Sequence, residues 1–356
     1  MQKQFKPALK LAAMAAALCS GAAMAQSSVT LYGQVDMFVG GIKSPGTGER
    51  AYVANSGGMQ TSYWGIKGTE DVGRGLKGIF DLNGFYRTDN GRSGRFDGDA
   101  MFSRNAYVGL QSETLGTIKL GRNTTPYFLS TILFNPLVDS YVFAPSIFHT
   151  YFSATSGSVF DPGVIGDSGW SNSVLYSTPK FGGLTANLIY SFGESAGEVG
   201  QNKWGGNLMY FNGAFGATAA FQQVDFNSVP NDLDTAGLER QDATQIGLSY
   251  DFKVVKLFAQ GQYIKTKALA GAPSGDIKHT NGQIGAAVPI GAGSLLASYS
   301  YAKAENDLGD FKRNTIGIAY DYNLSKRTDV YAAYYYDKIT GLEHGDSFGV
   351  GVRHKF

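Results

Sequence analysis

The feature that most constrains this chain is a two-residue alternation of apolar and other side chains that continues to its last residue. The C-terminal segment DSFGVGVRHKF places Phe348, Val350, Val352 and Phe356 on one phase. This is the pattern of a β-strand with one apolar face. Chain ends are usually polar and frayed, and an unpaired edge strand invites aggregation. We therefore expect the final strand to be paired on both edges.

Such segments are separated alternately by short turns and by long loops. This arrangement predicts about sixteen strands of roughly ten residues. The short turns are EDVGRG, SETLG, TPKFGG, FNGAFG, DFKVVK, IGAG and NLSKR. The longer stretches fall near residues 41–58, 88–100, 123–168, 193–203, 227–241, 267–279, 305–312 and 339–345. An even strand number with short turns at one end and long loops at the other is typical of a transmembrane β-barrel. In such a ring Phe356 should lie beside the first strand, near Val29.

The composition agrees with β structure and with export. The chain has 48 glycines, 21 tyrosines and 23 phenylalanines, which suits short aromatic strands and tight turns. Residues 1–25 carry three lysines, an apolar run and an Ala23-Met24-Ala25 cleavage pattern, which predicts a signal peptide before a barrel over residues 26–356. The single cysteine, Cys19, lies in this leader, and Leu18 stands where a lipoprotein would need a small residue.

Two classes of secreted β protein fit these features, a large soluble sandwich and a barrel in a bacterial outer membrane. Without the leader the chain has 27 basic and 29 acidic residues and no basic stripe, so we expect no nucleic-acid partner. No later segment approaches the length of about 18 apolar residues that a spanning helix needs. Aromatic residues near strand ends, interpreted as girdles at a lipid–water interface, favour the barrel; they include Tyr32, Phe38, Tyr320, Tyr322, Tyr334 and Tyr336.

Several spaced segments resemble one protein family. They are SSVTLYGQVD, WGIKGTEDVGRGLKGIFDL, FSRNAYVGLQSETLGTIKLGR, NSVLYSTPKFGGLTANLIYSFG, YNLSKRTDVYAAYYY and VGVRHKF. In this order they resemble the trimeric general porins of Gram-negative outer membranes, in the β-proteobacterial (neisserial and burkholderial) branch. The likeness covers nearly all of residues 28–356, with gaps in the loops.

The resemblance implies an all-β fold, a sixteen-stranded antiparallel transmembrane β-barrel with a long constriction loop folded into the lumen. It implies a homotrimer in the cell outer membrane, among outer-membrane lipid and lipopolysaccharide, with a water-filled pore in each barrel for small solutes in transit. It also implies that the barrel-assembly machinery reads Phe356 as its signal. It implies no cofactor.

Alternation assigns the side chains of the early strands to the lumen or to the exterior. The inward set is Tyr63, Lys67, Asp81, Asn83, Arg87 and Lys119. Tyr107 is assigned outward, which leaves Arg104 toward the lumen, where the resemblance matches it to a wall arginine of the constriction. Charge on the lipid side is costly, so these basic residues predict a wet lumen. The alternative is that they are solvated without a specific role.

Arg122 has the phase of outward-facing neighbours, and a lipid-facing arginine would cost about 2–4 kcal/mol. The resemblance implies a trimer contact between this arginine and the second long loop of a neighbour. That loop offers Asp89, Asp97 and Asp99 as partners. The alternative is that Arg122 extends to the membrane interface.

The stretch 123–168 is long and rich in aromatic residues, so we expect it to be buried inside the barrel. It has few acids, among them Asp139, and the basic wall is thinner than in many relatives because Tyr63 and Gln34 replace basic residues. Two functions remain open. One is passive diffusion of small hydrophilic solutes and ions. The other is a channel that prefers aromatic or amphipathic molecules, lined by Tyr63, Phe128, Phe134, Tyr141 and Phe143, although these aromatics could instead pack on the wall.

An enzyme is not expected. The four histidines, His149, His279, His344 and His354, are widely separated, without metal-ligand spacing, and no serine elbow or dinucleotide fingerprint occurs. A receptor role of the long loops is compatible with the sequence but has no motif. The sign of any ion selectivity stays open, because the wall is basic while the mature chain is nearly neutral.

Overall fold

The computed structural model describes residues 28–151, 168–193, 202–225, 238–269, 275–307 and 309–356. The predicted signal peptide therefore lies outside the described residues. The strands and helices are β1 (Ser28–Ile42), β2 (Ala51–Ser56), β3 (Tyr63–Gly73), β4 (Leu76–Phe85), β5 (Asn105–Ser112), β6 (Gly116–Thr124), α2 (Pro126–Leu133), α3 (Pro145–Tyr151), β7 (Gly169–Ser177), β8 (Leu184–Ser191), β9 (Lys203–Asn212), β10 (Phe215–Asp225), β11 (Leu238–Asp251), β12 (Lys256–Ala268), β13 (Ile277–Ile290), β14 (Gly293–Asn306), β15 (Gly309–Asn323), β16 (Thr328–Ile339) and β17 (Gly345–Lys355).

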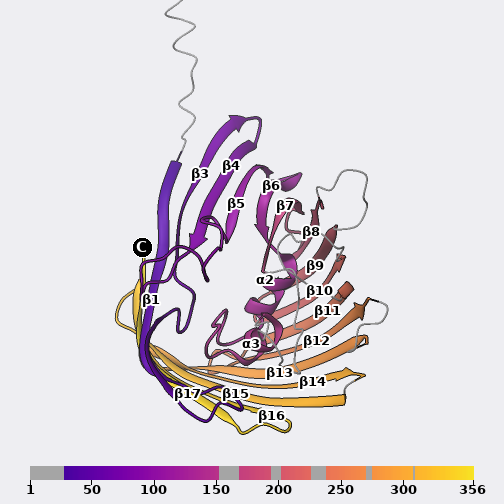
Figure 1. Ribbon diagram of the computed structural model, residues 1–356. Helices are drawn as coiled ribbons and strands as arrows, with labels where there is room; N and C mark the ends of the chain where they lie inside the picture. Colours follow the sequence, from indigo (N-terminus) through magenta and orange to yellow (C-terminus); the bar gives the residue numbers. More distant parts are fainter. Residues whose placement is uncertain (1–27, 152–167, 194–201, 226–237, 270–274, 308) are drawn as a thin grey trace, which may run out of the picture.

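The strands form one closed antiparallel ring (Figure 1). Each strand from β3 to β17 pairs with the next, and β17 returns to pair with β1. On the other edge of β1, β3 covers Ser28–Gln34 and β2 covers Met37–Ile42. Since β2 and β3 share one position in the ring, the barrel has sixteen positions and one extra strand, as predicted. The stretch 41–58, expected to be a loop, thus contains a strand over Ala51–Ser56.

The seven predicted short turns all join consecutive strands, from the β3–β4 turn to the β15–β16 turn. They lie at the same end of the barrel because antiparallel neighbours alternate in direction. The long connections lie at the other end, which in barrels of this kind is the extracellular end.

The ring closes at the last residue, as the C-terminal alternation predicted. The Phe356 N–H donates to the Gly33 carbonyl at 3.0 Å, and the Gly33 N–H donates to the Phe356 carbonyl at 3.1 Å. The expected neighbour was Val29. Alternation defines register only to within two residues, so a shift of even length keeps every face. Gly33 suits the contact because a Cβ there would lie 2.7 Å from Cζ of Phe356.

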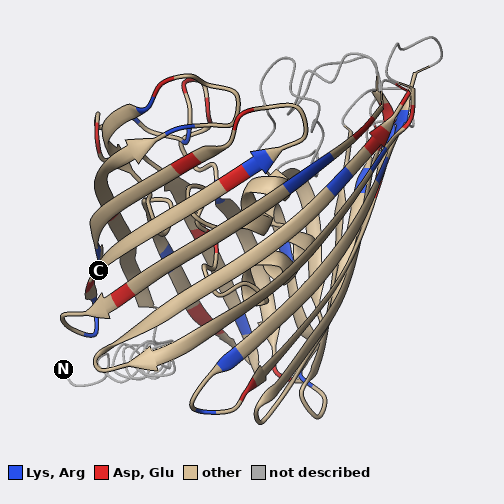
Figure 2. Ribbon diagram, turned by 90° about the horizontal axis from the view of Figure 1, so that it is seen from below, with Lys and Arg blue, Asp and Glu red and all other residues tan. Residues whose placement is uncertain are grey.

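The outer surface is apolar where the strands cross the bilayer. Leu31, Val108 and Ile246 are 61%, 62% and 65% exposed. On the front wall in Figure 2 the charged residues lie mainly toward the two ends of the strands. Among the described residues, no helix has the length and hydropathy to cross a membrane.

The aromatic girdle prediction was wrong for two residues. Tyr322 and Tyr334 lie on the outer face, at 40% and 42% exposure. Tyr32 and Phe38 face inward: the Tyr32 hydroxyl donates to Asp81, and Phe38 is buried at 2% exposure. Both belong to the inward phase of β1, so their position in the strand, not their aromatic character, decides their face.

The long loop after β6 folds into the barrel and packs on its wall over residues 125–151, as expected, while residues 152–167 lie outside the described residues. In Figure 1 the helices α2 and α3 lie inside the ring. Thr131 of α2 donates to Gln245 of β11 at 2.9 Å, and Thr150 of α3 donates to Gln262 of β12 at 2.7 Å. These contacts dock the two helices against β8–β15, and the buried cluster described next extends the packed side to β16 and to Phe38 of β1. The open part of the wall is therefore β3–β7 together with the first half of β1.

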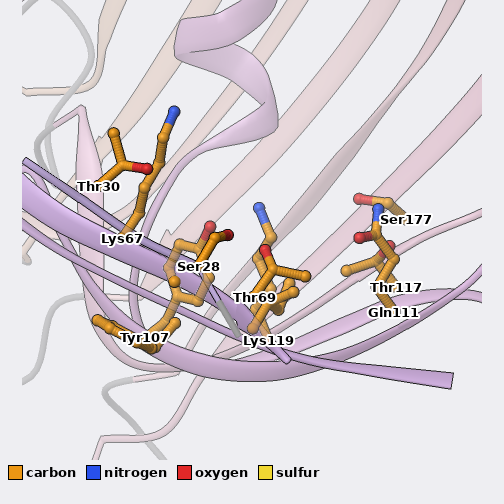
Figure 3. A pocket seen from close by; sticks show the side chains of 12 residues that line it. Ser28, Thr30, Lys67, Thr69, Tyr107, Gln111, Thr117, Lys119 and Ser177 are labelled. Carbon is orange, nitrogen blue, oxygen red and sulfur yellow. The ribbon is translucent and has the colours of Figure 1, made fainter. Parts of the chain in front are cut away.

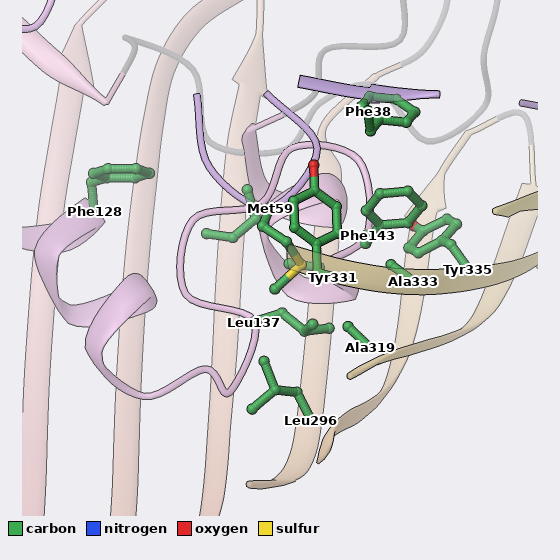
Figure 4. Packing of buried hydrophobic residues seen from close by; sticks show 12 residues of the cluster. Phe38, Met59, Phe128, Leu137, Phe143, Leu296, Ala319, Tyr331, Ala333 and Tyr335 are labelled. Atoms are coloured by element: carbon green, nitrogen blue, oxygen red, sulfur yellow. The ribbon is translucent and has the colours of Figure 1, made fainter. Parts of the chain in front are cut away.

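The loop aromatics pack rather than line a path. Phe134 and Phe143 are fully buried, and Phe128 is 8% exposed. Phe143 meets Phe38 edge to face, with ring centres 5.6 Å apart, in a cluster that includes Leu137 (Figure 4). The packing interpretation of these three phenylalanines therefore holds.

Replacing Phe143 with alanine should lower the free energy of unfolding by about 3–5 kcal/mol, because it leaves a cavity between the loop and the wall. Urea unfolding of the refolded barrel, followed by tryptophan fluorescence, measures this. Phe192→Ala is the control, since Phe192 is 53% exposed, and it should cost less than about 1 kcal/mol. Equal losses in the two variants would contradict the packing role of the loop.

Candidate functional site

The register of β1–β7 arranges the open wall in rows. Residues directly opposite each other in neighbouring strands point to the same face. One row runs from Thr30 through Lys67 and Asp81 to Tyr107. The adjacent row, nearer the short turns, runs from Thr69 to Gly109 and Lys119. Lys67, Asp81 and Lys119 therefore face the lumen.

Tyr107 corrects the sequence-based assignment, which placed it outward. It is the register partner of the inward-facing Asp81, while its neighbours Val108 and Leu110 are exposed on the outer surface. An aromatic residue fits both faces of a barrel strand, so its identity did not reveal its side. The adjacent aliphatic residues carried that information.

Three cations of the open wall each lie over a tyrosine ring. The distances from the cationic group to the ring centre are 4.2 Å for Arg104 over Tyr63, 4.5 Å for Lys67 over Tyr32 and 4.5 Å for Lys119 over Tyr107. The ring face attracts a cation without neutralising it. Among the ion pairs of the described residues, none involves Arg104, Lys67 or Lys119. Their positive charges are therefore available to solutes.

Arg104 shows why the phase argument alone was incomplete. It precedes β5, which begins at Asn105, so strand alternation does not apply to it. Its backbone N–H donates to the Asn83 carbonyl at 3.2 Å, and its side chain lies over Tyr63. The inward placement agrees with the expectation, although the reasoning from Tyr107 was wrong.

Two other inward-facing arginines, Arg313 on β15 and Arg353 on β17, are paired with acids. Arg313 donates to Asp337 at 2.8 Å, and both side chains are nearly inaccessible. Arg353 donates to Asp321 at 2.8 Å and to Asp329 at 3.2 Å. These groups neutralise each other, which leaves the β1–β7 side with the exposed positive charge.

The remaining acids of the site are occupied by hydrogen bonds. Asp81 accepts from the Tyr32 hydroxyl at 2.6 Å and from the Asn83 amide at 2.8 Å. Asp139 accepts from the Gln60 amide at 2.6 Å. Asn83 is fully buried and also accepts from the Asn105 N–H, so it supports the wall and does not face a solute.

Asp36 of β1 is a fully buried acid that the sequence analysis did not single out. Its carboxylate accepts from the backbone N–H groups of Gly58, Met59 and Gln60 at 3.0, 3.1 and 2.8 Å, and from the Tyr331 hydroxyl at 2.6 Å. It thereby holds the segment between β2 and β3 inside the ring.

This segment in turn holds the long loop. The Ser140 hydroxyl donates to the Gly58 carbonyl at 2.6 Å, and Gln60 of the same segment donates to Asp139. Three adjacent N–H groups on one carboxylate are a strong anchor. No sequence motif marks it, because the partners are more than twenty residues apart.

Arg87 differs from its expected place in the constriction. It lies beyond the end of β4, and its guanidinium binds Asp97 of the second long loop at 2.5 Å. Arg92 binds the same carboxylate at 2.7 Å. Hydrogen bonds from these two arginines lower the pKa of Asp97. Arg87 therefore contributes to the structure of the loop.

Arg122 is bonded within its own chain. Its Nε donates to the Ser103 carbonyl at 2.6 Å, and one terminal nitrogen donates to the Ser171 hydroxyl at 2.9 Å. Of its three expected partners, Asp97 and Asp99 are engaged with arginines of their own loop, and Asp89 is exposed.

Residues 11–342 match the family of Gram-negative porins. The chain belongs to that family. It is 33% identical to outer membrane porin protein 32 of Delftia acidovorans over 97% of this chain and 92% of that protein. It is 30% identical to an outer membrane porin protein of Bordetella pertussis over 98% of this chain and 100% of that protein.

A solved structure shares the fold. The anion-selective porin from Comamonas acidovorans superposes with a TM-score of 0.76 at 29% identity, covering 93% of this chain and 100% of that one. This porin is thus an outer-membrane channel for passive diffusion, like the relatives it matches.

His149 ties the loop of this porin to the wall by a buried hydrogen bond. Its Nε2 lies 2.6 Å from the hydroxyl of Thr315, which donates to Asp337 at 3.1 Å. Burial lowers the pKa of His149 well below its usual range, and the nearby Arg313 and His279 lower it further. The ring is therefore neutral near pH 7.

Acid should weaken this contact. Because the unfolded chain binds the proton more tightly, the stabilisation is complete above about pH 6.5 and is lost as the pH falls toward the lower native pKa. Unfolding free energy should drop by about 1.4 kcal/mol more in wild type than in His149→Gln between about pH 7.5 and pH 5.5. Urea midpoints at the two pH values measure it. Identical slopes would show that His149 does not couple the loop to pH.

Proposed function

We propose that this porin is a general diffusion channel with a weak preference for anions. The observation that carries the proposal is that Arg104, Lys67 and Lys119 lie over tyrosine rings without an acid partner among the described residues, while Arg313 on β15 and Arg353 on β17 are paired with acids. No bond is made or broken in this mechanism, so we propose no enzymatic activity and no cofactor.

The proposed selectivity arises from the electric field of the wall cations and from the radius of the pore. The docked loop narrows the lumen, and hydrated anions pass along the wall that holds the cations. In water a unit charge a few ångströms away is worth about 1 kcal/mol, which gives a preference and not a block. The similarity to the anion-selective porin of Comamonas acidovorans supports the sign. Tyr63, Lys67, Asp81, Arg104 and Lys119 are the proposed wall of the constriction, supported from behind by the buried Asn83, with Asp139 on the loop side.

The alternative, a channel for aromatic or amphipathic molecules, has less support. Phe134 and Phe143 have no exposed surface, and Phe128 has little. Tyr141 is half-buried against Phe128, with ring centres 6.5 Å apart, and Tyr63 lies beneath Arg104. The expected aromatic path is thus largely used for packing.

Replacing Arg104 with glutamine should lower the chloride-to-potassium permeability ratio by about two- to fivefold, since one exposed charge is removed. Reversal potentials of single channels in planar bilayers under a salt gradient give the ratio. Lys265→Gln is the matched control: Lys265 lies on the outer face, 3.9 Å from Asp276, and should change nothing. An unselective wild-type channel would contradict the proposal.

We also propose that three copies assemble, with Arg122 at the contact and Asp89 of a neighbour as its partner, because Asp97 and Asp99 are engaged within their loop. Arg122→Ala and Asp89→Asn should each lower the temperature at which trimers dissociate in detergent, as seen on unheated gels. Asp97→Asn is the control for a change of the same loop. Unchanged dissociation in both test variants would contradict the contact.

The assembly signal at Phe356 and contacts with lipopolysaccharide remain proposals from the family resemblance.

A further inference from the structure

The open wall contains a recess that the selectivity proposal does not explain. Its volume is about 320 Å³, and it is lined from β1 and from each of β3 to β7 (Figure 3). It has room for about ten water molecules, far more than a simple ion needs. A recess of this size can hold a small organic solute.

The register places the recess near the short-turn mouth. Its lining includes Gln111, Thr117 and Ser177, which are successive register partners close to the ends of β5, β6 and β7. Arg104 precedes β5 at the opposite end of that strand and does not line it. The recess is therefore separate from Arg104.

Two cations and several neutral polar groups make up the chemistry of the recess. Lys67 and Lys119 both line it, and no carboxylate does. In Figure 3 Lys67 lies toward one end, Lys119 near the middle, and Gln111, Thr117 and Ser177 gather at the other end. The closest luminal acid in the register, Asp81, is occupied by Tyr32 and Asn83. The site thus offers two positive charges without a competing anion.

The neutral groups extend the recognition beyond charge. The hydroxyls of Thr69 and Thr117 and the Gln111 amide can each donate and accept hydrogen bonds. The Ser177 hydroxyl donates to Asn187 at 2.6 Å and can accept one from a solute. For Thr69 and Thr117 no hydrogen bond of the hydroxyl occurs among the residues that the structure describes. Such groups suit the hydroxyls of a polyol, which also donate and accept.

The width of the recess depends on glycine. Gly109 lies between Ile79 and Lys119 in the row that crosses the recess. A Cβ at this position would lie 2.4 Å from the Ile118 carbonyl and 3.3 Å from Ile79 Cγ1. A side chain therefore does not fit at this position, and the glycine leaves the row without a side chain between Ile79 and Lys119.

We propose that this recess is a weak binding site for phosphorylated sugars or polyols on their way through the channel. A phosphate monoester has a charge of about −1.5 to −2 at pH 7, which matches the two lysines. The hydroxyls of the solute then bond to the threonine, serine and glutamine side chains. The proposal rests on the anion-preferring channel and names one solute class for its wall. Binding must be weak, because a solute that does not leave would block conduction.

The test uses block of ion current by glucose 6-phosphate in planar bilayers, with glucose and inorganic phosphate as comparison solutes. Glucose 6-phosphate should reduce conductance at lower concentration than either comparison solute. It should also act more strongly from the short-turn side, because the recess opens near that mouth.

Variants locate the block. Lys67→Gln and Lys119→Gln should each raise the half-blocking concentration of glucose 6-phosphate about tenfold, the effect of one charged hydrogen bond. Thr117→Val should raise it about threefold while the reversal potential stays as in wild type. Lys180→Gln is the matched control, because it removes the same charge at the same mouth, where Lys180 is exposed in the β7–β8 turn and does not line the recess. It should leave the half-blocking concentration unchanged.

The outcomes separate the two proposals. Anion preference without block by glucose 6-phosphate, or equal block by inorganic phosphate, overturns the recess proposal and leaves the selectivity proposal standing. An equal effect of Lys180→Gln and Lys119→Gln overturns the location. Loss of both block and anion preference in wild type overturns both. Heat-modifiable migration on gels confirms that each variant has folded before it is measured.

Discussion

Every backbone N–H and C=O that crosses the hydrocarbon of a membrane must be bonded within the protein, and the rest of this structure depends on that constraint. The ring meets it because β17 returns to pair with β1, a pairing that ends where Phe356 and Gly33 exchange two hydrogen bonds. Closure removes both edges of the sheet. Once the ring is closed, side chains alternate between lipid and lumen, and the apolar outer surface and polar inner wall follow.

The lumen is divided between a packed side and an open side. The long loop docks on β8–β16 and on Phe38 of β1 through buried aromatic rings and hydroxyl–amide bonds, and Asp36 holds the segment that secures the loop from the other direction. Paired arginines and acids are found on the packed side. The open side carries cations over tyrosine rings. The electrostatic asymmetry of the pore is thus a result of which wall the loop covers.

Much of the fold could be predicted because strand alternation and turn chemistry are local. The seven short turns and the ring of sixteen positions follow from patterns a few residues long. Errors occurred where a local pattern fits two structures. Tyr107 suits a girdle or a lumen, Ala51–Ser56 reads as loop until it pairs with β1, and a register shift from Val29 to Gly33 changes no face. The site was predicted less completely, since Arg87 is inward by pattern but binds Asp97 in the loop.

The sequence by itself determined the class of this protein: an exported, closed antiparallel barrel with a buried loop and basic residues on its inner wall. Only the tertiary structure decided which of those basic residues have a positive charge that no acid compensates. Arg313 and Arg353 meet acids on neighbouring strands, whereas Arg104, Lys67 and Lys119 meet tyrosine rings. The physical reason is the distance along the chain over which each effect acts. Alternation acts over two residues of one strand, while neutralisation of a charge depends on partners that the register and the docked loop bring within about 4 Å.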